Sequence, residues 1–323
     1  MARKKPLRKR NQKTSSESNP DLPPMMSSEQ MMGDISKLLQ DKDFESVDEI
    51  NQFLAEQFMG GSGMPIPQSE PESDLEHAQA LIYEAHEARS KSKALKLVRD
   101  ALSISPDCVD GYVLLAELNA KTLAEAWALY EAGVRAGERV LGDEFEELKG
   151  HFWGFIETRP YMRARLGLAI TLWQLDRLHD AAEHMAAMLE LNPNDNQGVR
   201  QMYIVLLIEL DDTKRIEKLF KQYPDDWSAA WKYSKALHNF RKHGAGKKAD
   251  DLLNKAIDFN PYVPPYILGK KKMPKNPNVT YYSPGDENEA IDYLVTGRNS
   301  WVITEGATEW LAGVVNAGGG GSK

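Results

Sequence analysis

The sequence predicts an all-α protein built as a TPR-like solenoid of about five helical hairpins. Three observations predict this fold. A fixed spacing of small and apolar residues recurs along residues 74–262, prolines follow several of its occurrences, and apolar positions in this region recur at helical intervals. Such repeats stack on their neighbours to bury a shared core.

The repeat has a marker in its second helix. A small residue is followed four positions later by a larger apolar residue, then by a small or apolar residue and a proline. Small residues fit where two helices approach closely, and proline ends a helix. Three occurrences are Ala94, Val98, Ala101 and Pro106; Ala181, Met185, Met188 and Pro193; and Ala249, Leu253, Ala256 and Pro261.

Two further units are less regular. One places Arg215 at the small position and Leu219 after it, and the other has Ala126, Tyr130 and Gly133 without the proline. The last two regular markers lie 68 residues apart, which is twice the TPR period of 34. The alternative fold is a non-repetitive helical bundle whose alanines and leucines follow a similar spacing.

The N-terminal part of the chain differs in composition from the repeats. Residues 1–27 are basic and then rich in Ser, Pro and Asn, which predicts a disordered tail. Residues 28–59 predict a short helical appendage, whose second helix begins at a capping-box pair, Ser46 and Glu49. Residues 60–73 are rich in Gly and Pro and predict a flexible linker.

An aromatic insertion interrupts the repeats. About 21 extra residues lie between Gly133 and Ala181. Their rings either fill a seam between misaligned repeats or line a ligand pocket, and the sequence is compatible with both interpretations. The aromatic residues include Phe145, Phe152, Trp153 and Phe155.

The C-terminal part of the chain predicts a cap for the last repeat. Residues 263–315 begin with an extended, Pro-rich stretch and continue with two helices, the first of which has Asp286 as its N-cap. A helix that covers the open face of the final repeat keeps a solenoid soluble. Residues 316–323 are rich in Gly and predict a flexible tail.

Two blocks of residues resemble the suppressor-of-tumorigenicity-seven family. The first is Gly111 to Glu117, continuing to Ala136-Gly-Glu138, and the second is Ala256 to Leu268, followed by Glu289-Ala290-Ile291. The chain is also similar to soluble bacterial TPR proteins in the stretch 159–165 and in 191–198. The resemblance implies a TPR-like scaffold without enzymatic activity. Animal members of the family are membrane proteins.

Composition narrows the class of protein. Cys108 is the only cysteine, which excludes an intrachain disulfide and a multi-cysteine metal site. The longest apolar run, Met202 to Ile208, is far shorter than the ~20 residues that span a bilayer. No apolar segment follows the basic start, as a secretory signal would require. We therefore expect a soluble, cytoplasmic protein, or a nuclear one in a eukaryote, with no membrane span.

Motifs for catalysis or metal binding do not emerge. The glycine clusters lack the lysine of a phosphate-binding loop, and no Gly-x-Ser-x-Gly elbow presents a nucleophile. The closest histidine pairs, His179/His184 and His238/His243, are five apart rather than the four of a helical zinc site. We expect no enzyme, no cofactor and no metal.

Binding of a protein or peptide partner is better supported, because the first helices of stacked hairpins line a concave groove. Basic residues in the groove would attract an acidic or C-terminal carboxylate group, while apolar residues would hold side chains. The alternative is that the basic residues pair internally with Glu157, Glu209 or neighbouring acids. The predicted groove residues are Arg163, Ile170, Trp173, Arg200, Ile204, Lys232 and Lys235.

The basic tail suggests a second function. The net charge is −8, although residues 1–13 contain seven bases and no acid, so the rest of the chain repels phosphate backbones. The tail would be a nuclear-import signal, a tether to nucleic acid or ribosomes, or a solubilising end. No aromatic residue is interleaved for base stacking. Its basic residues include Arg3, Lys4, Lys5, Arg8, Lys9 and Arg10.

Overall fold

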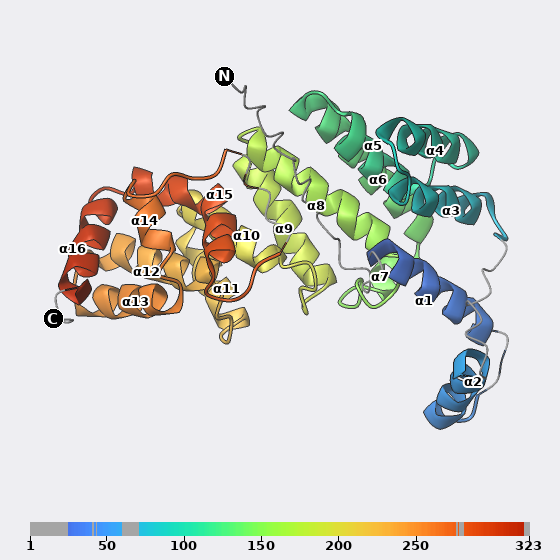
Figure 1. Ribbon diagram of the computed structural model, residues 1–323, viewed down its shortest axis with the longest axis horizontal. Coiled ribbons are helices and arrows are strands. Elements are labelled where there is room, and N and C mark those ends of the chain that lie inside the picture. The colour runs from blue at the N-terminus through green and yellow to red at the C-terminus, as the bar shows by residue number, and fades with distance from the viewer. Residues whose placement is uncertain are drawn as a thin grey trace, which may run out of the picture. The chain divides into compact units, whose positions relative to one another are not determined.

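The computed structural model describes residues 25–40, 42, 44–59, 71–275, 277 and 281–319. Within these ranges the secondary structure consists of sixteen helices without a strand (Figure 1). The predicted all-α class is therefore confirmed. The chain divides into two compact units, Met1–Pro71 and Glu72–Lys323.

The first unit contains α1 (Met25–Gln40) and α2 (Val47–Met59). α1 begins at Met25, three residues before the start expected for the appendage. The predicted cap of α2 is confirmed, since Ser46 Oγ accepts a hydrogen bond from the N–H of Glu49 at 3.3 Å. Residues 1–24 and most of the expected linker lie outside the described residues.

In the second unit, consecutive helices pack against each other in pairs (Figure 1). Neighbouring pairs are also in contact, through α4 and α5, α5 and α8, α9 and α10, and α10 and α12. The pairs are α3 (Asp74–His86) with α4 (Lys91–Ile104), α5 (Val109–Asn119) with α6 (Leu123–Leu141), α8 (Arg159–Gln174) with α9 (Leu178–Leu191), α10 (Val199–Glu209) with α11 (Thr213–Gln222), and α12 (Ala229–His243) with α13 (Lys247–Phe259).

The marker residues lie on the buried side of three of the second helices. In α4, α9 and α13 the marker side chains are at most 5% exposed, and each helix ends two residues before its proline. In α11 the pattern is displaced, because Ile216 is buried and Arg215 is not. The Arg215 guanidinium instead donates hydrogen bonds to Asp212 and Glu183 at the surface, which avoids burying a charge in the core.

The aromatic insertion packs into the main core. Without a proline after Gly133, α6 continues to Leu141, and the short helix α7 (Glu144–Glu147) follows. Phe145, Phe152 and Tyr161 make edge contacts with one another, with ring centroids 4.9 to 5.8 Å apart, and Phe152 is fully buried. These contacts favour the interpretation that the rings fill a seam between helix pairs.

The C-terminal segment differs in detail from the expectation. Residues Val263–Ile267 form a short helix, α14, instead of extended chain, because proline is tolerated in a first helical turn. The predicted N-cap of α15 (Glu287–Ile303) is confirmed, since Asp286 Oδ1 accepts a hydrogen bond from the N–H of Glu289 at 2.8 Å. α16 (Ala307–Gly319) continues through Asn316 and Ala317, so residues 316–319 are helical rather than part of a flexible tail.

One contact between α6 and α8 depends on glycine. A Cβ atom added at Gly167 would lie 2.2 Å from the Cε1 atom of Tyr130. We predict that Gly167→Ala lowers the free energy of unfolding by about 1–3 kcal/mol through overpacking, although alanine is the better helix former. Urea unfolding measures the change.

Gly313→Ala in α16 is the matched control, because no atom lies within 4 Å of the added Cβ. It should leave stability unchanged or raise it by up to about 1 kcal/mol. Equal unfolding midpoints for the two variants would contradict the packing argument.

Candidate binding surface

Arg163 lies near the start of α8 and forms a buried ion pair. Its Nε and Nη2 atoms donate to Oδ1 and Oδ2 of Asp110 in α5, at 2.8 and 2.7 Å. Asp110 is 2% exposed and also accepts a hydrogen bond from Gln79 of α3 at 3.0 Å. The guanidinium therefore connects helices of its own chain, through Asp110 rather than Glu157.

Arg200, in the first turn of α10, is held in a similar way. Its Nε donates to Asp226 at 2.6 Å and its Nη1 to Asp195 at 2.9 Å, while the guanidinium lies 5.4 Å from the ring centroid of Tyr223. The side chains of Asp195 and Asp226 are almost fully buried. Both predicted arginines therefore form ion pairs with acids of the chain itself, and none of these acids is Glu209.

The two predicted lysines lie over aromatic rings. The Nζ atom of Lys232 is 5.2 Å from the ring centroid of Phe259, and that of Lys235 is 5.7 Å from the centroid of Phe220. Cation–π contacts of this kind are worth about 0.5–1 kcal/mol at exposed sites. All four predicted cations thus contact groups of the chain itself.

The three apolar groove residues divide between partial and full burial. Ile170 and Trp173 of α8 are half-buried, whereas Ile204 of α10 is fully buried, which corrects its predicted role as a partner contact. All six residues Tyr203–Ile208 are at most 5% exposed. Since a helix turns once in 3.6 residues, this run is covered on every side. α15 packs on both α10 and α12 and supplies part of that cover.

Glu289 attaches the start of α15 to the helix pairs. Its Oε1 accepts a hydrogen bond from the N–H of Ala229, in the first turn of α12, at 2.9 Å. Its Oε2 accepts from Asn260 at 3.0 Å and from the N–H of Gly285 at 2.7 Å. A carboxylate at a helix N-terminus satisfies amides that have no partner within the helix.

Arg241 attaches the end of α15. Its guanidinium donates to the carbonyl oxygens of Ile208 in α10 and Ser300 in α15, and to Oγ1 of Thr304 at 2.7 Å. It also lies 3.7 Å from a carboxylate oxygen of Asp211. One side chain in α12 therefore caps the last turns of two other helices.

Aromatic rings fill the space between these two attachments. Tyr293 of α15 stacks on Tyr233 of α12 with ring centroids 5.9 Å apart, and its hydroxyl accepts a hydrogen bond from Trp301 Nε1 at 2.9 Å. Burial raises the pKa of Tyr293 to about 12. Trp310 of α16 stacks on Trp301 and on Phe240, so α15 and α16 share one aromatic cluster.

The opposite side of α15 exposes aliphatic side chains. Val295, Val302 and Ile303 are 52%, 54% and 57% exposed. Exposed apolar residues that cluster on one helix are typical of interaction sites.

Glu209 at the end of α10 connects this side of α15 to α8. Its carboxylate accepts hydrogen bonds from Trp173 Nε1 at 2.9 Å and from Asn299 Nδ2 at 3.1 Å. The indole of α8 and the exposed side of α15 are thereby neighbours. We call this region the α8–α15 surface, comprising Ile170, Trp173, Val295, Val302 and Ile303.

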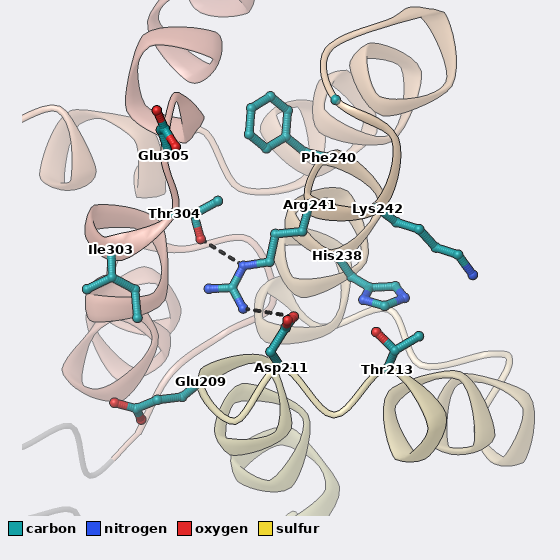
Figure 2. Close-up of a pocket in the computed structure, with 11 residues that line it drawn as sticks. Glu209, Asp211, Thr213, His238, Phe240, Arg241, Lys242, Ile303, Thr304 and Glu305 are labelled. Atoms are coloured by element: carbon teal, nitrogen blue, oxygen red, sulfur yellow. Dashed lines mark hydrogen bonds and ion pairs between the residues drawn. The ribbon is translucent and has the colours of Figure 1, made fainter.

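A pocket lies where α10, α12 and α15 end. It has a volume of about 660 Å³, and Figure 2 shows Arg241 in its middle, with His238 and Thr213 on one side and Ile303 and Glu209 on the other. The lining residues are Glu209, Asp211, Thr213, His238, Phe240, Arg241, Lys242, Gly244, Ile303, Thr304 and Glu305.

Burial favours the neutral forms of Cys108 and of two histidines. Burial raises the pKa of the Cys108 thiol to about 12, so a reactive thiolate is not available at neutral pH. Burial also lowers the pKa of His184 and His238. Among the residues that the structure describes, no cluster of His, Cys, Asp and Glu is arranged to hold a metal ion.

Sequence reasoning did not find Glu289 or Arg241. Glu289 follows the Asp286 cap by three residues, as capping glutamates do, and Arg241 belongs to a basic last turn that is typical of a solvated helix end. Neither pattern signals a buried contact. The six basic residues of the predicted tail lie outside the described residues, so the role of the tail and the cytoplasmic location stay predictions.

Comparison with known proteins agrees with the two sequence blocks noted above. A family model described as ST7 protein matches residues 70–317. This chain belongs to the ST7 protein family. The match covers every helix of the second unit from α3 to α15 and most of α16.

Individual ST7-family relatives are distant in sequence. The human suppressor of tumorigenicity 7 protein-like is 24% identical over 262 residues, which cover 73% of this chain and 45% of that protein. The suppressor of tumorigenicity 7 protein of Macaca fascicularis is 25% identical over 266 residues, 72% of this chain and 49% of that protein. The chain thus spans about half the length of these relatives. Among its described residues, no helix is long and apolar enough to cross a bilayer.

The Asp110–Arg163 pair should contribute strongly to stability. Asp110→Asn removes the carboxylate that accepts two hydrogen bonds from a mostly buried guanidinium, so we predict a loss of about 3 kcal/mol in the free energy of unfolding. Asp107→Asn is the control, because the Asp107–Arg139 pair has comparable distances but is exposed and should cost less than about 1 kcal/mol. Chemical denaturation distinguishes the two, and equal losses would refute the role of burial.

His238 should make the protein less stable in weak acid. Burial is the main cause that lowers the pKa of His238 below 6.5. Among the nearby charges, Glu217 and then Asp211 raise this pKa, whereas Lys242 and then Arg241 lower it. The unfolded chain therefore binds a proton more readily than the folded chain. The free energy of unfolding should fall as the pH decreases from about 7 to 5.

His238→Phe keeps a ring against Phe220 and should reduce this pH dependence when thermal unfolding is followed at several pH values. His243→Gln changes an exposed imidazole of the same helix and should keep the wild-type slope. An unchanged slope in His238→Phe would show that other groups cause the acid sensitivity.

Proposed function

We propose that this ST7-family protein is a non-enzymatic scaffold, a TPR-like solenoid that binds a protein or peptide partner at the α8–α15 surface. The observation that carries the proposal is the exposure of Val295, Val302 and Ile303 next to the Glu209-linked indole of Trp173. Consecutive antiparallel helix pairs with small residues at their contacts support the TPR-like arrangement.

The chemistry of this surface favours apolar side chains in the partner. The cations expected to attract an acidic group are held by Asp110, Asp195 and Asp226, and by aromatic rings. Burying three exposed aliphatic side chains contributes roughly 25 cal/mol per Å² of apolar area removed from water. An amphipathic helix or an extended segment with spaced apolar residues fits such a surface.

Two candidate catalytic groups among the described residues, Cys108 and His238, are not arranged as a nucleophile with its base, which supports a binding role over a catalytic one. The Cys108 thiol is buried with a pKa of about 12, and the buried Nε2 atom of His238 forms no hydrogen bond that could activate a serine or cysteine. A scaffold requires none of these groups.

Site-specific photo-crosslinking in cells that produce the protein tests the proposal. Benzoylphenylalanine at Val295 or Val302 should yield an adduct of discrete mass, because a partner covers these positions. The same probe at Lys255, which is exposed on α13, should yield none. Adducts of equal yield at Lys255, or no adduct at either valine, would count against the proposal.

The identified partner then allows a quantitative measurement. Val295→Asp and Val302→Asp together should weaken its binding to the purified chain at least tenfold, or about 1.4 kcal/mol, because a carboxylate would be desolvated at the contact. Lys255→Asp controls for the change in net charge. Circular dichroism verifies that the variants keep their helices.

A further inference from the structure

Both apolar and polar side chains line the pocket at the ends of α10, α12 and α15. Phe240 and Ile303 are its apolar walls, and the hydroxyls of Thr213 and Thr304 lie on opposite sides of Arg241 (Figure 2). Its volume of about 660 Å³ falls in the range of small-molecule sites. The pocket has room for more than one side chain.

The cations of this pocket already have protein partners. The Arg241 guanidinium donates to Thr304, Ser300 and Ile208 and lies near Asp211. The Lys242 ammonium donates to Glu217 Oε1 at 2.6 Å. These contacts hold both cations against acceptors of the protein itself.

The pocket also presents hydrogen-bond acceptors. His238 is 8% exposed, lines the pocket, and has an Nε2 atom that is buried without a hydrogen-bond partner. A neutral imidazole accepts at Nε2 when its proton is on Nδ1. The Asp211 carboxylate is 75% exposed, and Glu305 is exposed in the turn between α15 and α16.

The charges that line the pocket also favour a hydrogen-bond donor, because they are negative overall. Three carboxylates line the pocket, those of Glu209, Asp211 and Glu305, against the two cations of Arg241 and Lys242. α10, α12 and α15 all end here, and a helix C-terminus carries about half a negative charge. A positively charged hydrogen-bond donor complements such a site.

We propose that this pocket binds an ammonium or guanidinium group. The acceptors offered to this group are the carboxylates of Glu305 and Asp211 at the mouth and His238 Nε2 at the wall, and the Phe240 ring offers a surface for a cation–π contact. The group is carried either by a basic side chain of a peptide or by a free polyamine. The site adjoins the α8–α15 surface, since Ile303 belongs to both, but it does not rest on the function proposed for that surface.

Calorimetric titration of the full-length chain with agmatine, which has both cationic groups, tests the proposal. We expect saturable binding at one site in moderate salt. Glu305→Gln should weaken it at least fivefold by removing a carboxylate, and His238→Phe should do the same by removing the acceptor while keeping a ring. Glu84→Gln, an exposed carboxylate on α3, should bind agmatine like the wild type.

Two further probes distinguish the source of the group. An acetylated Gly-Arg-Gly amide that binds more tightly than spermidine indicates a peptide side chain, and the reverse order indicates a polyamine; either order supports the cation site. Thermal unfolding verifies that both pocket variants are folded. No saturable binding of agmatine to the wild type, or wild-type affinity in folded Glu305→Gln and His238→Phe, would overturn the proposal.

Discussion

α10 is apolar on every side, and the other helices of the second unit are arranged so that they bury it. Six consecutive buried residues, Tyr203–Ile208, leave no side of the helix that tolerates water. α9, α11 and α12 pack on it as neighbours in the sequence of pairs, and α15 returns from the C-terminal region to pack on it as well. Burial of this run makes α15 part of the core, and the polar attachments at Glu289 and Arg241 determine where α15 lies.

This arrangement covers helices that the sequence predicted to line an open groove. The first helices of a TPR-like array are expected to line a groove, yet here α10 and α12 contact the chain's own α15. The exposed apolar side chains lie instead on the far side of α15 and on the adjoining residues of α8. Glu209 links these two helices, since it accepts hydrogen bonds from both Trp173 and Asn299. The same carboxylate also lines the pocket of Figure 2.

Periodicity and helix-ending residues made most of the helices predictable. Ala181 and Ala249 are buried because the marker spacing places them at helix contacts, and Asp286 caps α15 by a local bond. The site was less predictable because its contacts join distant positions. From the sequence alone, Arg163 is a candidate for a cation that lines the groove. Its partner Asp110 lies 53 residues earlier, so the structure is needed to show the pair. Ile204 has the spacing of a groove residue, and only the return of α15 explains its burial.

The return of α15 has a consequence for folding. In a simple repeat array each unit is stabilised by its immediate neighbours, and folding can proceed from one end. Here hydrogen bonds join Tyr282 to Gln201 and Asn299 to Glu209 across 81 and 90 residues. Such long-range closure raises contact order and slows folding. During synthesis, α10 emerges from the ribosome well before the helix that covers it, so the nascent chain exposes an aggregation-prone apolar helix until α15 is made.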